Sequence, residues 1–176
     1  MSLYFARFSL ISAIRLINHG LYRIELIEDV NLLLEDMSEG TFIAMVLAPI
    51  LNQLFIKNKK VWYAKYGETC LRASAEEQHS QKTDDERRSP GKKIDTIIAL
   101  RNDDEEFSVT EVSGPPSKKD WPHFIGDRLK IIKRAKTLMN RFARLRPNSD
   151  IRTVILYGMQ IYCKFWTLLS FIIVCC

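Results

Sequence analysis

The sequence predicts a mixed α/β or α+β domain, in which a central sheet containing a hairpin is flanked by helices. Two runs rich in β-forming residues, 93–100 and 106–113, flank the polar segment 101–105, which is typical of a hairpin turn. A long amphipathic helix is expected over residues 121–145, and another strand over 151–160. Strands on both sides of a long helix indicate that the helix crosses over one face of the sheet.

Length and charge narrow the class of protein. The 176 residues are 47% hydrophobic, which is enough for one ordinary domain and an appendage. Residues 115–150 hold ten Lys/Arg and three acids, whereas the other 140 residues hold 16 Lys/Arg and 18 Asp/Glu. The net charge of +5 therefore comes from one segment, whose expected partners are nucleic acid or an acidic protein.

The four cysteines show neither metal-ligand spacing nor a disulfide framework, and the three histidines are scattered. A structural zinc site is therefore not expected. The simplest compartment for such a chain is a reducing, intracellular one, either cytoplasm or nucleus.

Three parts are expected along the chain: an N-terminal helical extension (1–37), a core (38–162) and an apolar C-terminal tail (163–176). Helices in the extension are expected over residues 2–18 and 21–36. The tail is expected to form a final strand or to lie outside the fold, with a membrane anchor the less favoured alternative. Its uncharged run from Phe165 has only 12 residues, against the ~20 that span a bilayer.

The first half of the core begins with a helix that Ser38 or Thr41 caps, and Pro49 either bends this helix or marks a later start. A strand is expected at 60–66, because it alternates and is rich in aromatic residues. The polar segment 67–90 is expected to be an exposed loop. A helical turn within the loop is expected at residues 73–78.

The hairpin brings two acidic residues to one place. If the turn is symmetric about Asp103, Asp95 faces Glu111 directly across the ladder. The same register sets three more pairs on this face: Lys93 with Ser113, Ile97 with Val109, and Ala99 with Phe107. Like charges that face each other destabilise a sheet unless a cation, a shared proton or water compensates them. One or two carboxylates commonly hold Mg2+, so this pair is a candidate magnesium site; with an asymmetric turn, one carboxylate would lie in solvent.

The helix expected over 121–145 divides into two arcs. Its apolar arc is expected to pack on the sheet and consists of Phe124, Ile125, Ile131, Ile132, Ala135, Leu138, Met139, Phe142 and Leu145. Its basic arc includes the candidate nucleic-acid-binding residues Lys130, Lys133, Arg134, Arg141 and Arg144, together with Lys136. Such an arc is either a solvated surface or a surface that binds phosphates. No aromatic residue interleaves it, so base stacking along this helix is not expected.

Six short segments between residues 38 and 162 carry a resemblance: Gly67-Glu68, Gly91-x-Lys93-x-Asp95, Glu111-Val112-Ser113-Gly114, Asp127-x-Leu129-Lys130, Leu138-Met139-Asn140-Arg141 and Gly158-x-Gln160. They look like segments of an uncharacterised, much expanded family of early-diverging fungi. That family continues with more strands after the position of Gln160, which leaves room for a shortened or misread gene product here.

The order of elements is also similar to the core of the PD-(D/E)XK nucleases, which have a restriction-endonuclease-like fold. This resemblance implies that Asp95 is the first ligand of a catalytic Mg2+ and Glu111 the second, with Glu68 a weaker acidic candidate. In that superfamily a lysine two residues after the glutamate positions or activates water, but Ser113 stands there in this chain.

Two lysines are candidates to replace the missing one. Lys93 lies opposite Ser113 in the expected register, and Lys130 lies on the following helix. The expected function is thus a divalent-metal-dependent nuclease-like domain, with Asp95, Glu111 and Lys93 as catalytic residues. The alternatives are a non-catalytic nucleic-acid or protein interaction module of the same fold, since fold does not settle function, or a tail-anchored membrane-associated protein.

Overall fold

The computed structural model describes residues 36–55, 60–80, 82–83, 87–114, 119–150, 154–162 and 165–172. Within them, five strands form one sheet in the order β1-β2-β3-β4-β5. The strands are β1 (Trp62–Cys70), β2 (Lys93–Leu100), β3 (Glu106–Val112), β4 (Ile155–Tyr162) and β5 (Phe165–Ile172). Neighbours are antiparallel except for β3 and β4, which are parallel. The predicted mixed sheet of an α+β fold is therefore confirmed.

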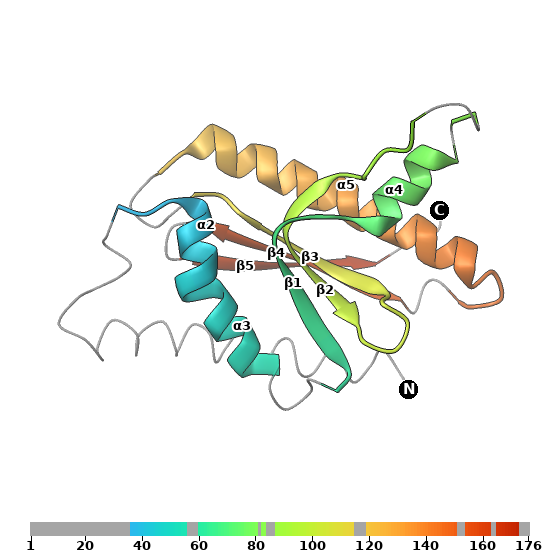
Figure 1. Cartoon of the computed structure of the whole chain (residues 1–176), viewed down its shortest axis with the longest axis horizontal. Coiled ribbons are helices and arrows are strands. Elements are labelled where there is room, and N and C mark those ends of the chain that lie inside the picture. Colours follow the sequence, from blue (N-terminus) through green and yellow to red (C-terminus); the bar gives the residue numbers. More distant parts are fainter. Residues whose placement is uncertain are drawn as a thin grey trace.

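Helices cover both faces of this sheet (Figure 1). They are α2 (Glu39–Phe42), the π-helix η2 (Ile43–Leu47), α3 (Ala48–Phe55), α4 (Arg72–His79) and α5 (Trp121–Leu145). Tyr66 of β1 bonds to Asn52 of α3, whereas Gln160 of β4 bonds to the Phe124 carbonyl of α5. The pairings Tyr66–Thr96–Thr110 and Gln160–Glu111 put these two side chains on opposite faces, because Thr110 and Glu111 are adjacent.

The first described helix starts where the sequence predicts. Ser38 is its N-cap, and its hydroxyl accepts a hydrogen bond from the Thr41 N–H at 3.1 Å. Pro49 does not end the helix. A π-helical stretch immediately precedes it, in which the Ala48 N–H donates to the Ile43 carbonyl. Proline removes one helical hydrogen bond and crowds the preceding turn, and a widened π-turn is one way to accommodate it.

Strand β1 is longer than predicted. The sequence places the start of a polar loop at Gly67, but the strand continues to Cys70 through a bulge between Tyr66 and Thr69. Gly67 and Glu68 both have positive φ angles there (78° and 48°). A bulge inserts unpaired residues without ending the ladder. The strand therefore continues beyond Tyr66, where the alternation of polar and apolar residues in the sequence stops.

The predicted hairpin register is confirmed near its middle and wrong at the turn. Ile97 pairs with Val109, as symmetry about Asp103 requires. An irregularity then pairs Ala99 with Glu106 instead of Phe107. Glu106 consequently points to the face that carries α4, while Phe107 packs against Trp62 on the other face, with ring centroids 5.8 Å apart.

Helix α5 has the predicted bounds, and the Asp120 carboxylate caps it by accepting from the His123 N–H at 2.9 Å. The predicted apolar arc is only partly correct. Ile131, Ala135, Leu138, Met139 and Phe142 are buried. However, Ile125, Ile132 and Leu145 are 42%, 46% and 52% exposed. Because the helix contacts the sheet mainly at β3 and β4, the covered stripe is narrower than the apolar arc.

Residues 165–172 of the predicted C-terminal tail (163–176) form β5. This edge strand pairs with β4 along its length. Of the alternatives for this segment, the final strand is confirmed for residues 165–172. In the described part of the chain, no helix combines the length and the apolar character needed to cross a bilayer. The extension over residues 1–35 lies outside the described residues.

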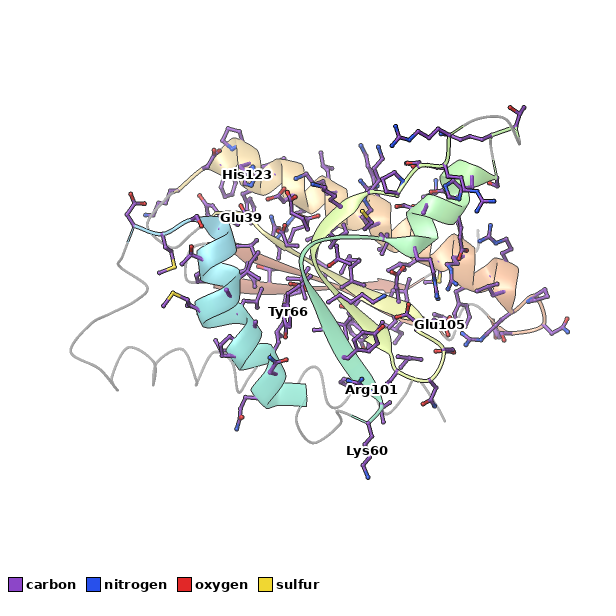
Figure 2. The ribbon with its side chains drawn as sticks, in the orientation of Figure 1. Glu39, Lys60, Tyr66, Arg101, Glu105 and His123 are labelled. Atoms are coloured by element: carbon purple, nitrogen blue, oxygen red, sulfur yellow. The ribbon has the colours of Figure 1, made fainter. Side chains whose placement is uncertain are left out.

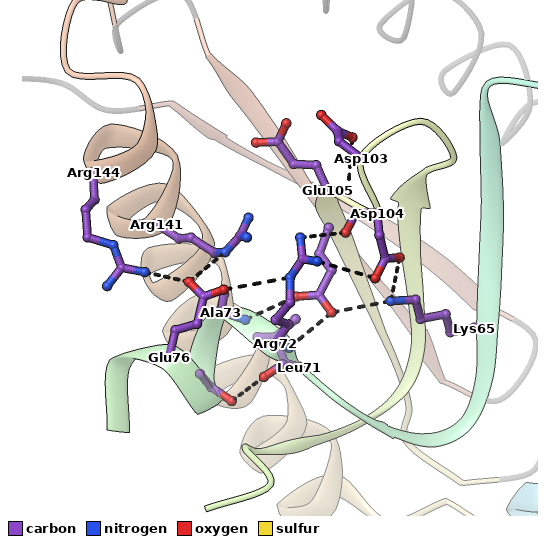
Figure 3. A network of polar contacts seen from close by, with 12 residues as sticks. Lys65, Leu71, Arg72, Ala73, Glu76, Asp103, Asp104, Glu105, Arg141 and Arg144 are labelled. Carbon is purple, nitrogen blue, oxygen red and sulfur yellow. Dashed lines mark hydrogen bonds and ion pairs between the residues drawn. The ribbon is translucent and has the colours of Figure 1, made fainter. Parts of the chain in front are cut away.

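A polar network ties α4 to the hairpin and to α5 (Figure 3). The Glu106 carboxylate accepts the backbone N–H groups of Arg72 and Ala73 at 3.1 and 3.2 Å. These are the first N–H groups of α4, whose own N-cap, Leu71, offers no side-chain acceptor. One turn further along α4, Glu76 binds Arg141 and Arg144 of α5 at 3.0 and 2.5 Å.

Replacing Glu106 with Gln is expected to lower the free energy of unfolding by ~1–3 kcal/mol, because buried N–H donors at the start of α4 lose their charged acceptor. Urea unfolding measures this change. Asp103→Asn is the matched control: this carboxylate is 53% exposed in the hairpin turn and should change stability by less than ~0.5 kcal/mol. Equal effects of the two substitutions would contradict the capping role.

Candidate functional site

Four carboxyl groups from four separate elements meet at one end of the sheet. Glu39 comes from α2, Asp95 from β2, Glu111 from β3 and Asp127 from α5. The Asp95 carboxylate accepts the Val112 N–H at 2.7 Å, and Glu111 and Glu39 are both close enough to it to shift its pKa. The predicted meeting of Asp95 and Glu111 is therefore present in the structure.

Burial and mutual repulsion raise the pKa values of three of these acids. Desolvation is the largest cause for Glu111, followed by the charge of Asp95, and the pKa of Glu111 rises to about 9. Desolvation and the charges of Asp95 and Asp127 raise the pKa of Glu39 to about 7. Desolvation also raises the pKa of Asp95, against the opposing hydrogen bond from Val112. The fold thus keeps a proton on Glu111 well above the pH at which a free glutamate ionises.

Two side chains of α5, those of Lys130 and His123, border the acids. Lys130 Nζ lies 2.6 Å from Asp127 Oδ1, and its pKa is raised by this hydrogen bond and by the charges of Asp127, Glu111 and Asp95, against a smaller desolvation effect. His123 Nε2 lies 3.1 Å from Asp127 Oδ2 and 3.9 Å from Glu39. Figure 2 shows Glu39 at the start of α2 just below His123 of α5. The contact between His123 and Glu39 thus links α5 to α2 beside the acidic residues.

The structure places Lys93 elsewhere. In the ladder between β1 and β2, Lys93 pairs with Cys70. The Lys93 ammonium group binds Glu68 at 2.6 Å on the surface, where both side chains are more than 60% exposed. Ser113 donates its N–H to the Ile161 carbonyl, so its backbone hydrogen bond joins it to β4. The structure therefore does not pair Lys93 with Ser113 as expected. Glu68 binds Lys93 on the surface and is not part of the acidic cluster. Of the two candidate lysines, Lys130 is the one whose charge acts on Asp95 and Glu111.

A buried glutamine orders the floor of the site. Gln160 pairs with Glu111 across the parallel strands β3 and β4. Its amide nitrogen donates to Ser113 Oγ at 2.9 Å and to the Phe124 carbonyl at 2.6 Å, while its oxygen accepts from Arg128 Nε at 3.0 Å. All three groups of this amide are therefore engaged, and they fix β3, β4 and α5 relative to one another.

The basic arc of α5 is partly neutralised. Arg141 and Arg144 are bound to Glu76 of α4. Arg134 is half-buried, and desolvation lowers its pKa. Lys130 borders the acids, and Lys133 is exposed. Only the half of the arc that lies towards the start of α5 thus remains as a surface for phosphates.

Asp95 and Glu111 fit a hard divalent ion by their chemistry. Among the described residues, no group of three or more His, Cys, Asp or Glu side chains is arranged to hold a metal ion by itself. Mg2+ usually keeps several waters and takes only one or two carboxylates from the protein. Glu111 Oε1 is buried and has no hydrogen-bond partner within the described part of the chain, so it is an acceptor that a cation could satisfy.

Sequence reasoning missed four members of this site: Glu39, His123, Asp127 and Gln160. The spacing of His123, Asp127 and Lys130 on one helix (i, i+4 and i+7) was a readable signal, because residues so spaced share one face. Gln160 follows a strand pattern, but the parallel pairing that sets it beside Glu111 depends on the crossover through α5. Glu39 follows the N-cap Ser38, where an acidic residue commonly interacts with the helix dipole, so its local sequence gives no sign of a second role.

Compared with known proteins, this chain matches no family model, no curated protein and no solved structure. Function must therefore be inferred from the site itself.

In the absence of divalent ions, the protein is expected to lose stability as pH rises above about 5. Glu111 keeps its proton in the fold to about pH 9, whereas it releases the proton near its ordinary value of 4.5 when unfolded. The folded state binds more protons between these values, so the free energy of unfolding falls by up to ~1.4 kcal/mol per pH unit for such a group. Urea unfolding in EDTA across this range measures the slope.

Glu111→Gln mimics the protonated acid and should flatten this slope. Glu68→Gln is the control: its carboxylate lies on the surface, and Lys93 lowers its pKa. That group is ionised in both states above pH 5, so its removal should leave the slope unchanged. An identical slope in wild type and Glu111→Gln would contradict the assigned origin.

Proposed function

We propose that this chain is a divalent-metal-dependent nuclease-like domain that acts on nucleic acid phosphodiesters. The observation that supports it best is the convergence of acids from α2, β2, β3 and α5 in a buried place that raises their pKa values. Uncompensated buried charge is costly, and titratable groups perturbed in this way gather at functional sites. The acidic pair on adjacent strands, next to a basic helix, agrees with the resemblance to the PD-(D/E)XK core.

In this proposal Asp95 and Glu111 hold Mg2+. Bound there, the ion would supply a water of lowered pKa and charge stabilisation for the phosphate. The Val112 N–H fixes the orientation of Asp95, and pairing with Gln160 fixes the backbone position of Glu111. Glu39 adds a third acid at the border, where its charge strengthens the attraction for a cation.

Lys130 takes the role that the superfamily gives to the lysine after the glutamate. Its ammonium group is held by Asp127 at 2.6 Å, and its side chain is half-exposed. A lysine so placed can hydrogen-bond an attacking water or a phosphate oxygen. Lys93, bound to Glu68 on the surface, is not placed for this role.

A non-catalytic nucleic-acid-binding module is the second candidate. One observation favours it: Ser113 stands where the superfamily has lysine. Such a module would keep the acid pair and the exposed part of the basic arc without hydrolysis. For either function we infer an intracellular protein, in cytoplasm or nucleus.

Mg2+ or Mn2+ is expected to raise the melting temperature of the protein. An ion at a hundred times its dissociation constant stabilises the fold by ~2.7 kcal/mol. The shift should grow from about pH 6 to about pH 8, because the ion displaces protons held by the raised pKa values. Differential scanning fluorimetry measures it.

Asp95→Asn should abolish this shift, and the control Asp103→Asn, in the exposed hairpin turn, should keep it. A shift of equal size in both variants would show that the ion binds elsewhere, and the metal proposal would fail.

Metal-dependent cleavage of single- and double-stranded DNA and RNA tests catalysis. Lys130→Ala is expected to lower kcat by about a hundredfold or more, the usual size for loss of a positioned hydrogen-bond donor that stabilises developing negative charge. Lys93→Ala should leave cleavage nearly unchanged, as should Lys60→Ala, which removes an exposed lysine before β1. Cleavage lost in Lys93→Ala but kept in Lys130→Ala would reverse the assignment. A metal-induced melting shift with no cleavage of any substrate would favour the binding module.

A further inference from the structure

Three aromatic rings form a cluster where α5 begins and β4 ends. Trp121 stacks on Phe124, with ring centroids 4.8 Å apart and planes 21° from parallel. Tyr162, the last residue of β4, lies against both rings, 4.8 Å from Phe124 and 6.4 Å from Trp121. Helix and strand thus each supply part of the cluster, so its geometry is set by the packing of α5 on the sheet.

Trp121 is the outer member of this cluster. It is 62% exposed, although large aromatic side chains contribute most to a fold when they are buried. The ring nevertheless has support, because Phe124 stacks against it and Tyr162 meets it edge to face. A supported but exposed aromatic surface is what a stacking ligand needs, since little side-chain freedom is lost when the ligand binds.

Positive charge lies next to the cluster. The Arg128 guanidinium sits 4.9 Å from the Phe124 ring centre and is fixed by Gln160. Arg128 follows Trp121 by seven residues, which puts it on the same side of the helix two turns later. Residues 121–136 hold five Lys/Arg and one acid. This combination of aromatic surface and positive charge is typical of sites that bind single-stranded nucleic acid.

We propose that Trp121 is a stacking surface for an unpaired nucleobase, with Arg128 beside it for the adjoining phosphate. The inference rests on the proposed function, and it narrows the substrate class to single-stranded nucleic acid or unpaired ends. The cluster and the acidic site share the first turns of α5: His123 and Asp127 lie between Trp121 and Lys130. The two lie on different sides of the helix, because residues 123, 127 and 130 share one face whereas residues 121 and 128 share another. The sequence pattern did not predict stacking on this helix, because these aromatic residues precede the basic arc instead of interleaving it.

The same helix face offers a competing use. Ile125, Leu129 and Ile132 continue an exposed apolar stripe from Trp121, and such a stripe suits a protein partner. We favour the nucleobase because the exposed ring is an indole stacked on another aromatic ring, and because the surrounding charge is positive. A protein partner would use the aliphatic residues as much as the tryptophan.

Fluorescence anisotropy with a labelled oligothymidylate, in EDTA so that no cleavage occurs, tests the proposal. Trp121→Ala is expected to weaken binding by about tenfold or more, the usual loss on removing one base-stacking ring. Trp121→Phe should restore most of it. An abasic oligomer of equal length should bind wild type and Trp121→Ala alike, because it has no base to stack.

Leu145→Ala, which trims another exposed residue of α5, should leave the affinity unchanged. Leu129→Ser should do the same for a nucleobase site, whereas a loss equal to that of Trp121→Ala would indicate a general apolar surface and overturn the proposal. Equal affinity of wild type and Trp121→Ala for the oligothymidylate would also overturn it. Trp121→Ala should keep the Mg2+-induced rise in melting temperature, so failure of the metal site and failure of the stacking site give different results.

Discussion

The structure depends on the placement of negative charge inside a small α+β fold. Asp95 and Glu111 end up beside each other because β2 and β3 form a hairpin whose ladder is symmetric at Ile97 and Val109. Antiparallel pairing leaves no choice of neighbours once the register is fixed. The repulsion that follows is offset only in part, by the Val112 N–H and by Lys130 across the site. The fold thus maintains an electrostatic cost that a well-packed core would avoid.

The contrast between two buried glutamates of β3 separates structural from functional charge. Glu106 is fully engaged: it accepts two N–H groups from the start of α4, and Lys65 lies 3.8 Å away. Glu111 has like charges as neighbours and an oxygen without a partner among the described residues. Buried acids that stabilise a fold are paired or hydrogen-bonded. By this criterion Glu106 is a structural residue, whereas the ionised form of Glu111 lacks compensating partners among the described residues.

The sequence was informative where local pattern decides the structure. The bounds of β2 and α5 and the caps Ser38 and Asp120 follow from propensity and capping chemistry. The placement of Asp95 and Glu111 on the same face of the sheet follows from the hairpin register. Prediction failed where tertiary packing decides: the bulge that continues β1, the irregularity at Ala99, and the exposure of Ile125 and Ile132 on α5. Glu39, Asp127 and Gln160 were missed because only the three-dimensional arrangement of α2, α5 and β4 brings them to the hairpin.

The serine at position 113 is consistent with the rest of the site. Ser113 is fully buried, and its hydroxyl accepts a hydrogen bond from Gln160, whose amide also binds Phe124 and Arg128. A lysine there would have to displace this network, because its ammonium needs several acceptors or water. The positive charge instead comes from Lys130 on α5. That one helix then supplies the lysine, the acid that holds it, the arginine fixed by Gln160 and the exposed tryptophan. In the proposed function, any movement of α5 relative to the hairpin would therefore change the proposed metal, phosphate and base contacts together.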